Sequence, residues 1–435
     1  MKNGFKYFAL IFLGSVLFGC SSPEHTVRSP SSETVQSVKA SADWDAKTAW
    51  EEFESYFRLF YAYLDKMDFD VEAALEAVEM RALKTEAAAD FRQELVRFGH
   101  IFADPHIIIG PLEDHDFNVV PTSADLRVIY QDNRYVVSDV RAGSAADLAG
   151  IEPEFQLTEV EAQAISSQVA EFFTDFVSEP TARQKSHAAT LLANGQRVGT
   201  RSLTFAEAGE FTLPNTRDYA RFLQNKPTVS VTYEDETAII RVHNALGNNE
   251  TIKAFDAAMV ETASAPSLII DLRETPSGGN TEVGRSIIGH FVTEPRPYQT
   301  HKIPSLEREF TVPRQFTEYV LPRAPYRDPA STVALGGYWT GSMGEGIVIG
   351  LDGAADMHII ASDMGDLLGG LSNYTLNKSG IRLDLPSEVL LHIDGTPREN
   401  FEADIPLFSA ERDTGGGDPA MKAALKHLQR YQNGQ

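Results

Sequence analysis

The chain has 435 residues and a mass of 47.9 kDa, a length that predicts more than one domain. Its 62 acidic and 38 basic residues give a formal net charge of −24, and no Lys/Arg cluster interrupts this excess, which argues against a nucleic acid partner. Hydrophobic residues make up 42% of the chain, which excludes wholesale disorder. The single Cys excludes an intrachain disulfide framework and a cysteine-based zinc site.

The N-terminus predicts a secretory signal peptide over residues 1–19. Lys2 and Lys6 precede an apolar stretch at 7–18, which is too short to span a bilayer as a helix, and small residues follow it. The segment 17–20, Leu-Phe-Gly-Cys, resembles the bacterial lipobox, which implies that Cys20 is acylated and anchors the chain. An ordinary signal peptide that happens to contain a Cys is the alternative.

Residues 20–42 are rich in Ser and poor in large apolar side chains, which predicts a flexible tether. A helical N-terminal domain is expected over 43–110. Asp45 is a candidate N-cap for an aromatic stripe at helical spacing, and further helices are expected at 71–81 and 85–98. Pro105 then forces a break before a β-branched strand.

The pattern changes to short strands over 120–205. Alternating segments at 126–130 and 135–140 are joined by the turn residues Asp132 and Asn133. The segment 141–151, RAGSAADLAGI, resembles a PDZ-domain turn and helix, with helices expected at 172–194 as an insertion. The resemblance implies a PDZ-like module, a type that can take up a peptide as an added strand.

Residues 227–412 are typical of an α/β domain, and 413–435 of a C-terminal helix or tail. The charged, Pro-containing stretches at 177–230 and 296–330 are typical of loops that could cover a site. Strands are expected at 229–233, 237–242, 267–272, 332–335 and 358–361, with helices at 253–261 and 282–292.

Two glycine-rich turns follow strands of this section. The first contains Gly278 and Gly279 and leads into a helix at Thr281, so its N–H groups could bind a phosphate or form half of an oxyanion hole. The second places Ser342 at the first turn of a helix, where free N–H groups and the helix dipole favour an oxygen nucleophile. A plain N-cap role for Ser342, and a dipole-complementing role for Glu345, are the alternatives.

Three segments together resemble one serine peptidase family. They are 268–280 with its Gly-Gly-Asn turn, 340–347 (TGSMGEGI), and 394–405, which begins Asp-Gly-Thr-Pro-Arg-Glu-Asn. The family comprises the tail-specific (C-terminal processing) proteases and the tricorn-core proteases. The resemblance implies a multidomain α/β fold: a helical N-terminal bundle, a PDZ-like β domain and a crotonase/ClpP-like α/β protease core.

The same resemblance implies the roles of individual residues. The tail-specific branch uses a Lys base downstream of its Ser, but 363–370 contains no Lys. The tricorn-like branch uses a His from an Asp-x-His-like segment, which implies His106 as base, Ser342 as nucleophile and Glu399 as the residue orienting His106. It also implies an oxyanion hole of backbone N–H groups from Met343 and from Gly278 or Gly279.

The sequence therefore predicts a serine endopeptidase acting on peptide or protein substrates by Ser-His acyl-enzyme chemistry. The lipobox resemblance adds a lipid-anchored location in the bacterial cell envelope, at the outer membrane facing the periplasm. No cofactor is expected, and no metal either, because His100 and Asp104 lack clustered partner ligands. A catalytically inactive peptide-binding envelope scaffold and a serine esterase remain alternative functions.

Overall fold

The computed structural model describes residues 44–432. The predicted signal peptide at 1–19, Cys20 and the tether at 20–42 lie outside the described residues. Within 44–432, no helix combines the length and the hydropathy needed to cross a membrane.

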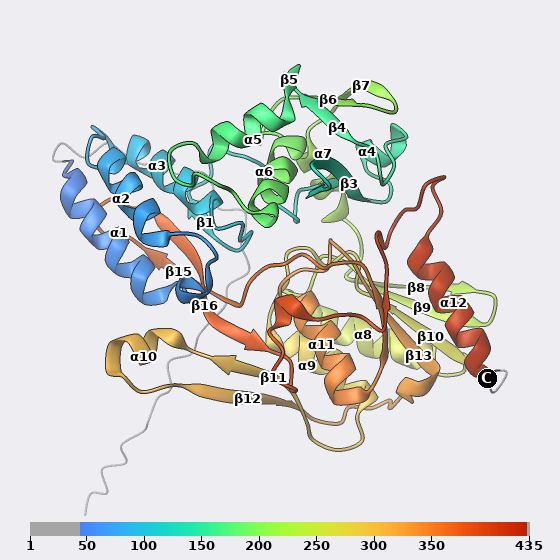
Figure 1. Cartoon of the computed structure of the whole chain (residues 1–435). Coiled ribbons are helices and arrows are strands. Elements are labelled where there is room, and N and C mark those ends of the chain that lie inside the picture. The colour runs from blue at the N-terminus through green and yellow to red at the C-terminus, as the bar shows by residue number, and fades with distance from the viewer. Residues whose placement is uncertain (1–43, 433–435) are drawn as a thin grey trace, which may run out of the picture.

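Three helices with an aromatic core form the N-terminal part of the structure (Figure 1). They are α1 (Ala46–Phe60), α2 (Val71–Ala82) and α3 (Ala88–His100), with a short 3-10 turn, η1 (Leu64–Lys66), after α1. Asp45 caps α1 as expected, because its carboxylate accepts the N–H groups of Lys47 and Thr48. The expected stripe is core: Trp50, Phe53 and Phe57 are buried, and the rings of Phe53 and Phe57 contact Phe98 of α3.

The middle part consists of short strands and helices. Its elements are β2 (Leu126–Gln131), β3 (Arg134–Val140), α4 (Ala145–Leu148), β4 (Leu157–Val160), β5 (Gln163–Ala164), α5 (Ile165–Phe173), α6 (Ala182–Asn194), β6 (Arg201–Phe205), β7 (Gly209–Leu213) and α7 (Thr216–Leu223). Asp132 and Asn133 both have positive φ, which closes the predicted β2–β3 hairpin. The expectation of loops over 177–230 is wrong, because α6, β6, β7 and α7 lie there.

A six-stranded sheet forms the core of the remaining part, in the order β17-β14-β13-β10-β9-β8. Its strands are β8 (Val229–Glu234), β9 (Thr237–Val242), β10 (Ser267–Asp271), β13 (Thr332–Gly336), β14 (His358–Ala361) and β17 (Ile405–Pro406). All neighbouring pairs are parallel except β8–β9. The predicted strands of this section are thereby confirmed, and the central strands β10 and β13 are buried along their whole length.

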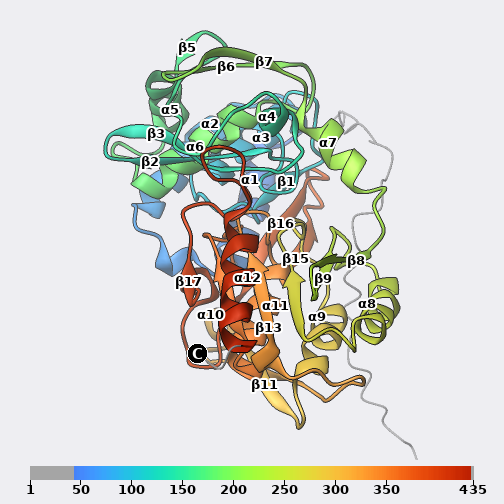
Figure 2. The same cartoon turned by 90° about the vertical axis from the view of Figure 1, so that its right-hand side faces the viewer.

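Helices cover both faces of this sheet (Figures 1 and 2). On one face lie α8 (Glu250–Glu261), α9 (Thr281–Ile288) with the 3-10 turn η2 (Gly289–Phe291), and α11 (Met343–Ala355). On the other lies α12 (Pro419–Gln432) (Figure 2). Its residues Ala420, Ala424 and Leu428 are buried against the sheet. Two further 3-10 turns are η3 (Pro329–Ser331) and η4 (Arg398–Asn400).

A second, five-stranded sheet joins the N-terminal helices to the core. It contains β1 (Ile108–Gly110), β11 (Arg296–Lys302), β12 (Gln315–Val320), β15 (Gly370–Thr375) and β16 (Arg382–Leu391). β1 follows α3 and pairs antiparallel with β16, with Ile109 opposite Leu383. The chain before β1, which carries His106, is thereby held against the core.

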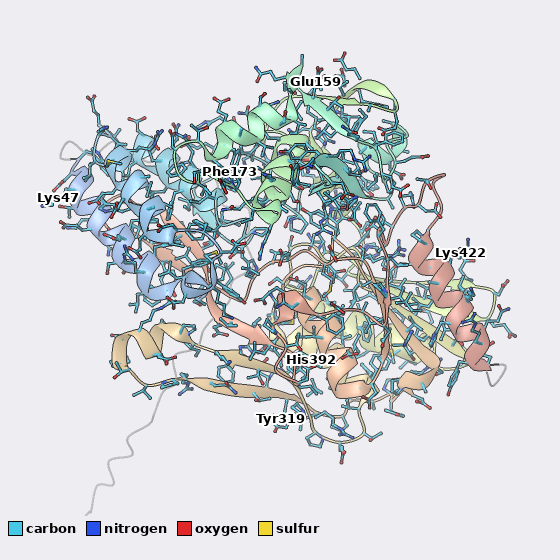
Figure 3. All side chains as sticks on the ribbon, viewed as in Figure 1. Lys47, Glu159, Phe173, Tyr319, His392 and Lys422 are labelled. Atoms are coloured by element: carbon cyan, nitrogen blue, oxygen red, sulfur yellow. The ribbon has the colours of Figure 1, made fainter. Side chains whose placement is uncertain are left out.

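The expectation of a loop at 296–330 is wrong. β11 and β12 form a hairpin that carries α10 (Pro304–Phe310) and extends under the N-terminal helices, with Tyr319 on β12 (Figures 1 and 3). Arg308 of α10 donates to the carbonyls of Leu59 and Tyr61 at the end of α1. β11 also pairs with β16, a partner far along the sequence that local patterning could not indicate.

Candidate active site

Two adjacent parallel strands bring the glycine-rich turns together. β10 and β13 are hydrogen-bonded neighbours, so the turns that follow them lie at the same edge of the sheet. Their pairing continues past the strand ends: the Thr275 N–H donates to the Trp339 carbonyl at 2.9 Å, and the Gly341 N–H donates to the Thr275 carbonyl at 3.2 Å. The turn with Gly278 is thereby fixed beside the turn with Ser342.

Ser342 occupies a strained backbone position directly before α11. Its φ of 51° and ψ of −108° lie outside the regions that non-glycine residues favour, and such conformations cost roughly 1–3 kcal/mol. The side chain is half-buried. The next residue, Met343, starts the helix, and the first N–H groups of a helix have no partner within it.

Gly278 contacts Ser342 so closely that no side chain fits there. A Cβ on Gly278 would lie 2.4 Å from Ser342 Cβ, 2.8 Å from Ser342 Oγ and 2.9 Å from the Met343 nitrogen. Gly278 also has a φ of 64°, a conformation that glycine adopts readily. A Cβ on Gly279 would instead meet the carbonyl of Leu246 at 2.1 Å, so Gly279 packs on a different segment.

The two glycines differ in what their N–H groups do. The Gly278 N–H donates to the Thr275 carbonyl at 3.2 Å, within the turn itself. The Gly279 N–H has no hydrogen-bond partner within residues 44–432, and Gly279 is half-buried, so a ligand or water can reach it. Of the two glycines expected to complete an oxyanion hole, Gly279 therefore has the free N–H donor. Gly278 instead lacks the side chain that would clash with Ser342.

A Gly278→Ala variant is expected to be less stable than a matched glycine variant elsewhere in the chain. Gly380 provides the matched control, because its φ of 70° is similar but a Cβ there would meet nothing within 4 Å. Gly380→Ala should cost about 1–2 kcal/mol of unfolding free energy from the backbone alone. Gly278→Ala should cost about 1–3 kcal/mol more from overpacking. Denaturant unfolding of both variants measures the difference, and equal losses would contradict the contact with Ser342.

Glu345 holds the backbone of Ser342. It is buried on the first turn of α11; one carboxylate oxygen accepts the Ser342 N–H at 2.6 Å and the other accepts the Asp366 N–H at 3.0 Å. Burial raises the pKa of Glu345 to about 8, although the Arg398 guanidinium 3.7 Å away acts in the opposite direction. Glu345 therefore does more than complement the helix dipole, because it ties the serine turn to the 363–370 segment.

Glu345→Gln is expected to lower the unfolding free energy by about 1–3 kcal/mol, because an amide NH2 group would face a backbone N–H donor. The folded carboxyl keeps its proton up to about pH 8, so its stabilising contribution is lost as the pH rises toward that value. The penalty of the variant should therefore shrink between pH 5 and pH 8. Urea unfolding across this range measures it, with the exposed Glu282→Gln as control; a pH-independent penalty would contradict the assignment.

His106 lies between α3 and β1 and is buried. Its Nδ1 is 2.7 Å from the carbonyl oxygen of Leu368, and its backbone N–H donates to the Asp104 carboxylate. A carbonyl oxygen only accepts, so Nδ1 carries the ring proton and the Nε2 lone pair is free in the neutral ring. Burial lowers the pKa of His106 to about 4, which keeps the imidazole neutral at pH 7.

The segment 363–370 connects the imidazole with the serine turn. Its Leu368 carbonyl binds His106, its Asp366 N–H binds Glu345, and its Gly365 N–H donates to the Thr340 carbonyl at 2.8 Å. In the sequence, the absence of a Lys was the only feature of residues 363–370 that bore on the site. Among the described residues, no hydrogen bond joins the His106 ring directly to Ser342.

Glu399 lies in η4 and does not contact the His106 ring through a hydrogen bond. Its Oε2 is buried and has no hydrogen-bond partner in the described part of the chain. The Leu368 carbonyl occupies the Nδ1 position that an orienting carboxylate would take. The role of Glu399 stays a prediction, while its neighbour Arg398, which the sequence interpretation overlooked, donates to the carbonyls of Leu367 and Gly369.

Asp104 links the His106 backbone to Tyr61 through hydrogen bonds. Its carboxylate accepts the His106 N–H at 3.0 Å and the Tyr61 hydroxyl at 3.1 Å, and burial raises the pKa of Asp104 to about 7. Across residues 44–432, no group of three or more His, Cys, Asp or Glu side chains is arranged to hold a metal ion.

The fold and this turn define a multidomain α/β protein with a site centred on a serine. No family model and no curated protein matches the sequence. The structure is similar to a solved CPAF mutant, at a TM-score of 0.59 and 13% identity, over 89% of this chain and 98% of that one. It is also similar to mature CPAF complexed with lactacystin, at a TM-score of 0.58 and 13% identity, over 90% and 99% of the two chains.

A third similar structure is a putative peptidase from Parabacteroides merdae, with a TM-score of 0.54 and 12% identity over 89% of this chain and 97% of that one. These likenesses extend over nearly the full length of each chain, so they concern the whole arrangement of helices, middle part and core. The multidomain α/β fold predicted from the peptidase-like motifs is thereby confirmed.

Proposed function

We propose that the protein is a serine-type peptidase that cleaves peptide bonds through an acyl-enzyme on Ser342. The observation that supports this most is the strained Ser342 at the start of α11, packed against Gly278 beside two N–H groups free to bind an anion. A plain N-cap needs neither the positive φ nor the glycine contact. Backbone strain persists where surrounding structure imposes it, as it often does at reacting groups.

The proposed mechanism is acyl transfer with a single base. Nε2 of His106 takes the Ser342 proton as Oγ bonds to the scissile carbonyl carbon, then gives it to the amine as the C–N bond breaks. Water, deprotonated by the same Nε2, then hydrolyses the ester. Catalytic hydrogen bonds are often open without substrate, so we expect the His106–Ser342 contact to close when a peptide binds.

The Met343 and Gly279 N–H groups are proposed to bind the oxyanion, since neither is used within the described residues. The Leu368 carbonyl is proposed to hold the His106 tautomer. Glu399 is proposed to act electrostatically, by stabilising the imidazolium that forms when Ser342 is deprotonated.

The structural likeness to CPAF and to a putative peptidase supports a peptide or protein as substrate. The N-terminal sequence supports acylation at Cys20 and a tether at 20–42, which would place the enzyme at the outer membrane facing the periplasm. Residues 120–205 are proposed to form a PDZ-like module by their resemblance to that domain.

Reaction with an alkyl fluorophosphonate tests the function. An activated serine oxygen is expected to be phosphonylated, and mass spectrometry of the digested protein should locate the modification at Ser342. Hydrolysis of a peptide library and of a p-nitrophenyl ester panel then separates a peptidase from an esterase. A protein that stays unlabelled above pH 7 and hydrolyses neither class would contradict the proposal and favour a scaffold.

A further inference from the structure

The outer edge of strand β2 is occupied from within the protein. β3 pairs with one edge of β2, which leaves the N–H and C=O groups of alternate residues pointing to the other side. Polar side chains of α6 bind these groups. The Val128 N–H donates to Thr190 Oγ1, and the Thr190 hydroxyl donates to the Val128 carbonyl. The Asn194 side chain accepts the Leu126 N–H and donates to the Leu126 carbonyl. The Tyr130 N–H donates to Ser186 Oγ.

The spacing of these side chains matches the spacing of a strand. Ser186, Thr190 and Asn194 follow each other every four residues, which is about 6 Å along a helix. Alternate residues of β2 are about 6.7 Å apart. The polar stripe of α6 therefore presents donors and acceptors in the register that a neighbouring strand would, and a peptide could add to this edge only by displacing the helix.

The first turn of α6 contacts both segments that reach the candidate active site. Gln184 is buried and donates to the Ile101 carbonyl at 2.7 Å, within the segment that leads to His106. Arg183 donates to the Ala103 carbonyl at 3.3 Å and pairs with the Asp366 carboxylate at 3.1 Å. Asp366 belongs to the 363–370 segment that binds both His106 and Glu345.

We infer that α6 occupies the edge of β2 where a peptide strand could otherwise pair. Bound there, α6 also positions the segment that carries His106. In this arrangement the edge does not take up a substrate peptide, and its occupancy by α6 keeps the base in place. The effect on catalysis rests on the proposed function, whereas the closed edge and the placing of residues 101–106 do not.

Thr190→Val in the full chain tests the inference, because valine keeps the shape and removes both hydrogen bonds to Val128. Amide hydrogen exchange is expected to become at least about tenfold faster at Val128 and at His106, since each tenfold change corresponds to about 1.4 kcal/mol of protection. Thr174→Val is the matched control, because the Thr174 hydroxyl bonds only its own helix at the Ala170 carbonyl. Unchanged exchange at Val128 would overturn the closed edge.

Ser186→Ala is a milder second variant, since it removes one bond to β2 at Tyr130. It should speed exchange at Tyr130 and leave the fold intact even if Thr190→Val does not fold. Exchange that rises at the β2 amides but not at His106 would overturn the positioning role.

Fluorophosphonate kinetics distinguish a positioning role from a purely structural one, because they measure the inactivation rate constant and the binding constant separately. We expect Thr190→Val to lower the inactivation rate constant kinact at Ser342 by about tenfold while the binding constant KI stays unchanged. Equal changes in both constants would overturn the positioning of His106. A wild-type protein that is never labelled would refute the proposed function, and the exchange at Val128 and His106 would still decide the inference.

Discussion

Ser342→Ala is expected to abolish fluorophosphonate labelling and to lower any peptidase activity by roughly 10⁴- to 10⁶-fold, the loss seen when a serine nucleophile is removed. Alanine retains the backbone N–H that Glu345 accepts, so the turn and its strained φ should persist. The thermal unfolding midpoint should therefore change by no more than about 2 °C. Labelling, hydrolysis and calorimetry on the same preparation measure the three quantities.

The matched control is Ser331→Ala, which removes another serine hydroxyl far from the glycine turns and should leave labelling at the wild-type rate. Retained hydrolysis in Ser342→Ala would refute the nucleophile. A large fall in the unfolding midpoint would instead mean that the hydroxyl supports the fold, as an N-cap does.

His106→Ala is expected to slow the labelling of Ser342 by roughly 10³-fold or more, because the hydroxyl loses its base. The exposed His115→Ala is the matched control, and it should leave the rate unchanged. Unchanged labelling in His106→Ala would remove the base assignment.

The pH dependence of labelling gives a second, independent test of His106. Burial lowers the pKa of His106, so the neutral, basic form persists down to about pH 4 and the labelling rate should fall only as the pH drops through that value. An ordinary imidazole would lose its basicity near pH 6.5. A stopped-flow profile between pH 3.5 and pH 8 measures the midpoint, and a midpoint near 6.5 would contradict the buried, neutral base.

The core strands could be predicted because their chemistry is local. The centres of these strands, 268–270 and 333–335, are continuously apolar, and a glycine-rich turn follows each strand, so consecutive residues indicate buried parallel strands. Adjacent parallel strands end at one edge, and the approach of Gly278 to Ser342 follows from that geometry.

The partners of His106 could not be predicted in the same way. Its Nδ1 binds the carbonyl of Leu368, a backbone group that every residue type has, so no side-chain pattern indicates it. The hairpin of β11 and β12 could not be predicted, because β16, the other strand that pairs with β11, lies far along the chain. In addition, Phe316 and Tyr319 of β12 remain exposed. Most of β12 is exposed, so no apolar–polar alternation marks it as a strand.

The packing of α12 has a consequence for how the protein is made. This helix covers Ile269, Val333 and Ile360 on one face of the core sheet, and the chain reaches it only after every strand of that sheet. Until α12 has docked, the folding chain therefore has a sheet with one bare apolar face, which is a state prone to aggregate. A chaperone that binds exposed apolar surface would bind this face until α12 docks.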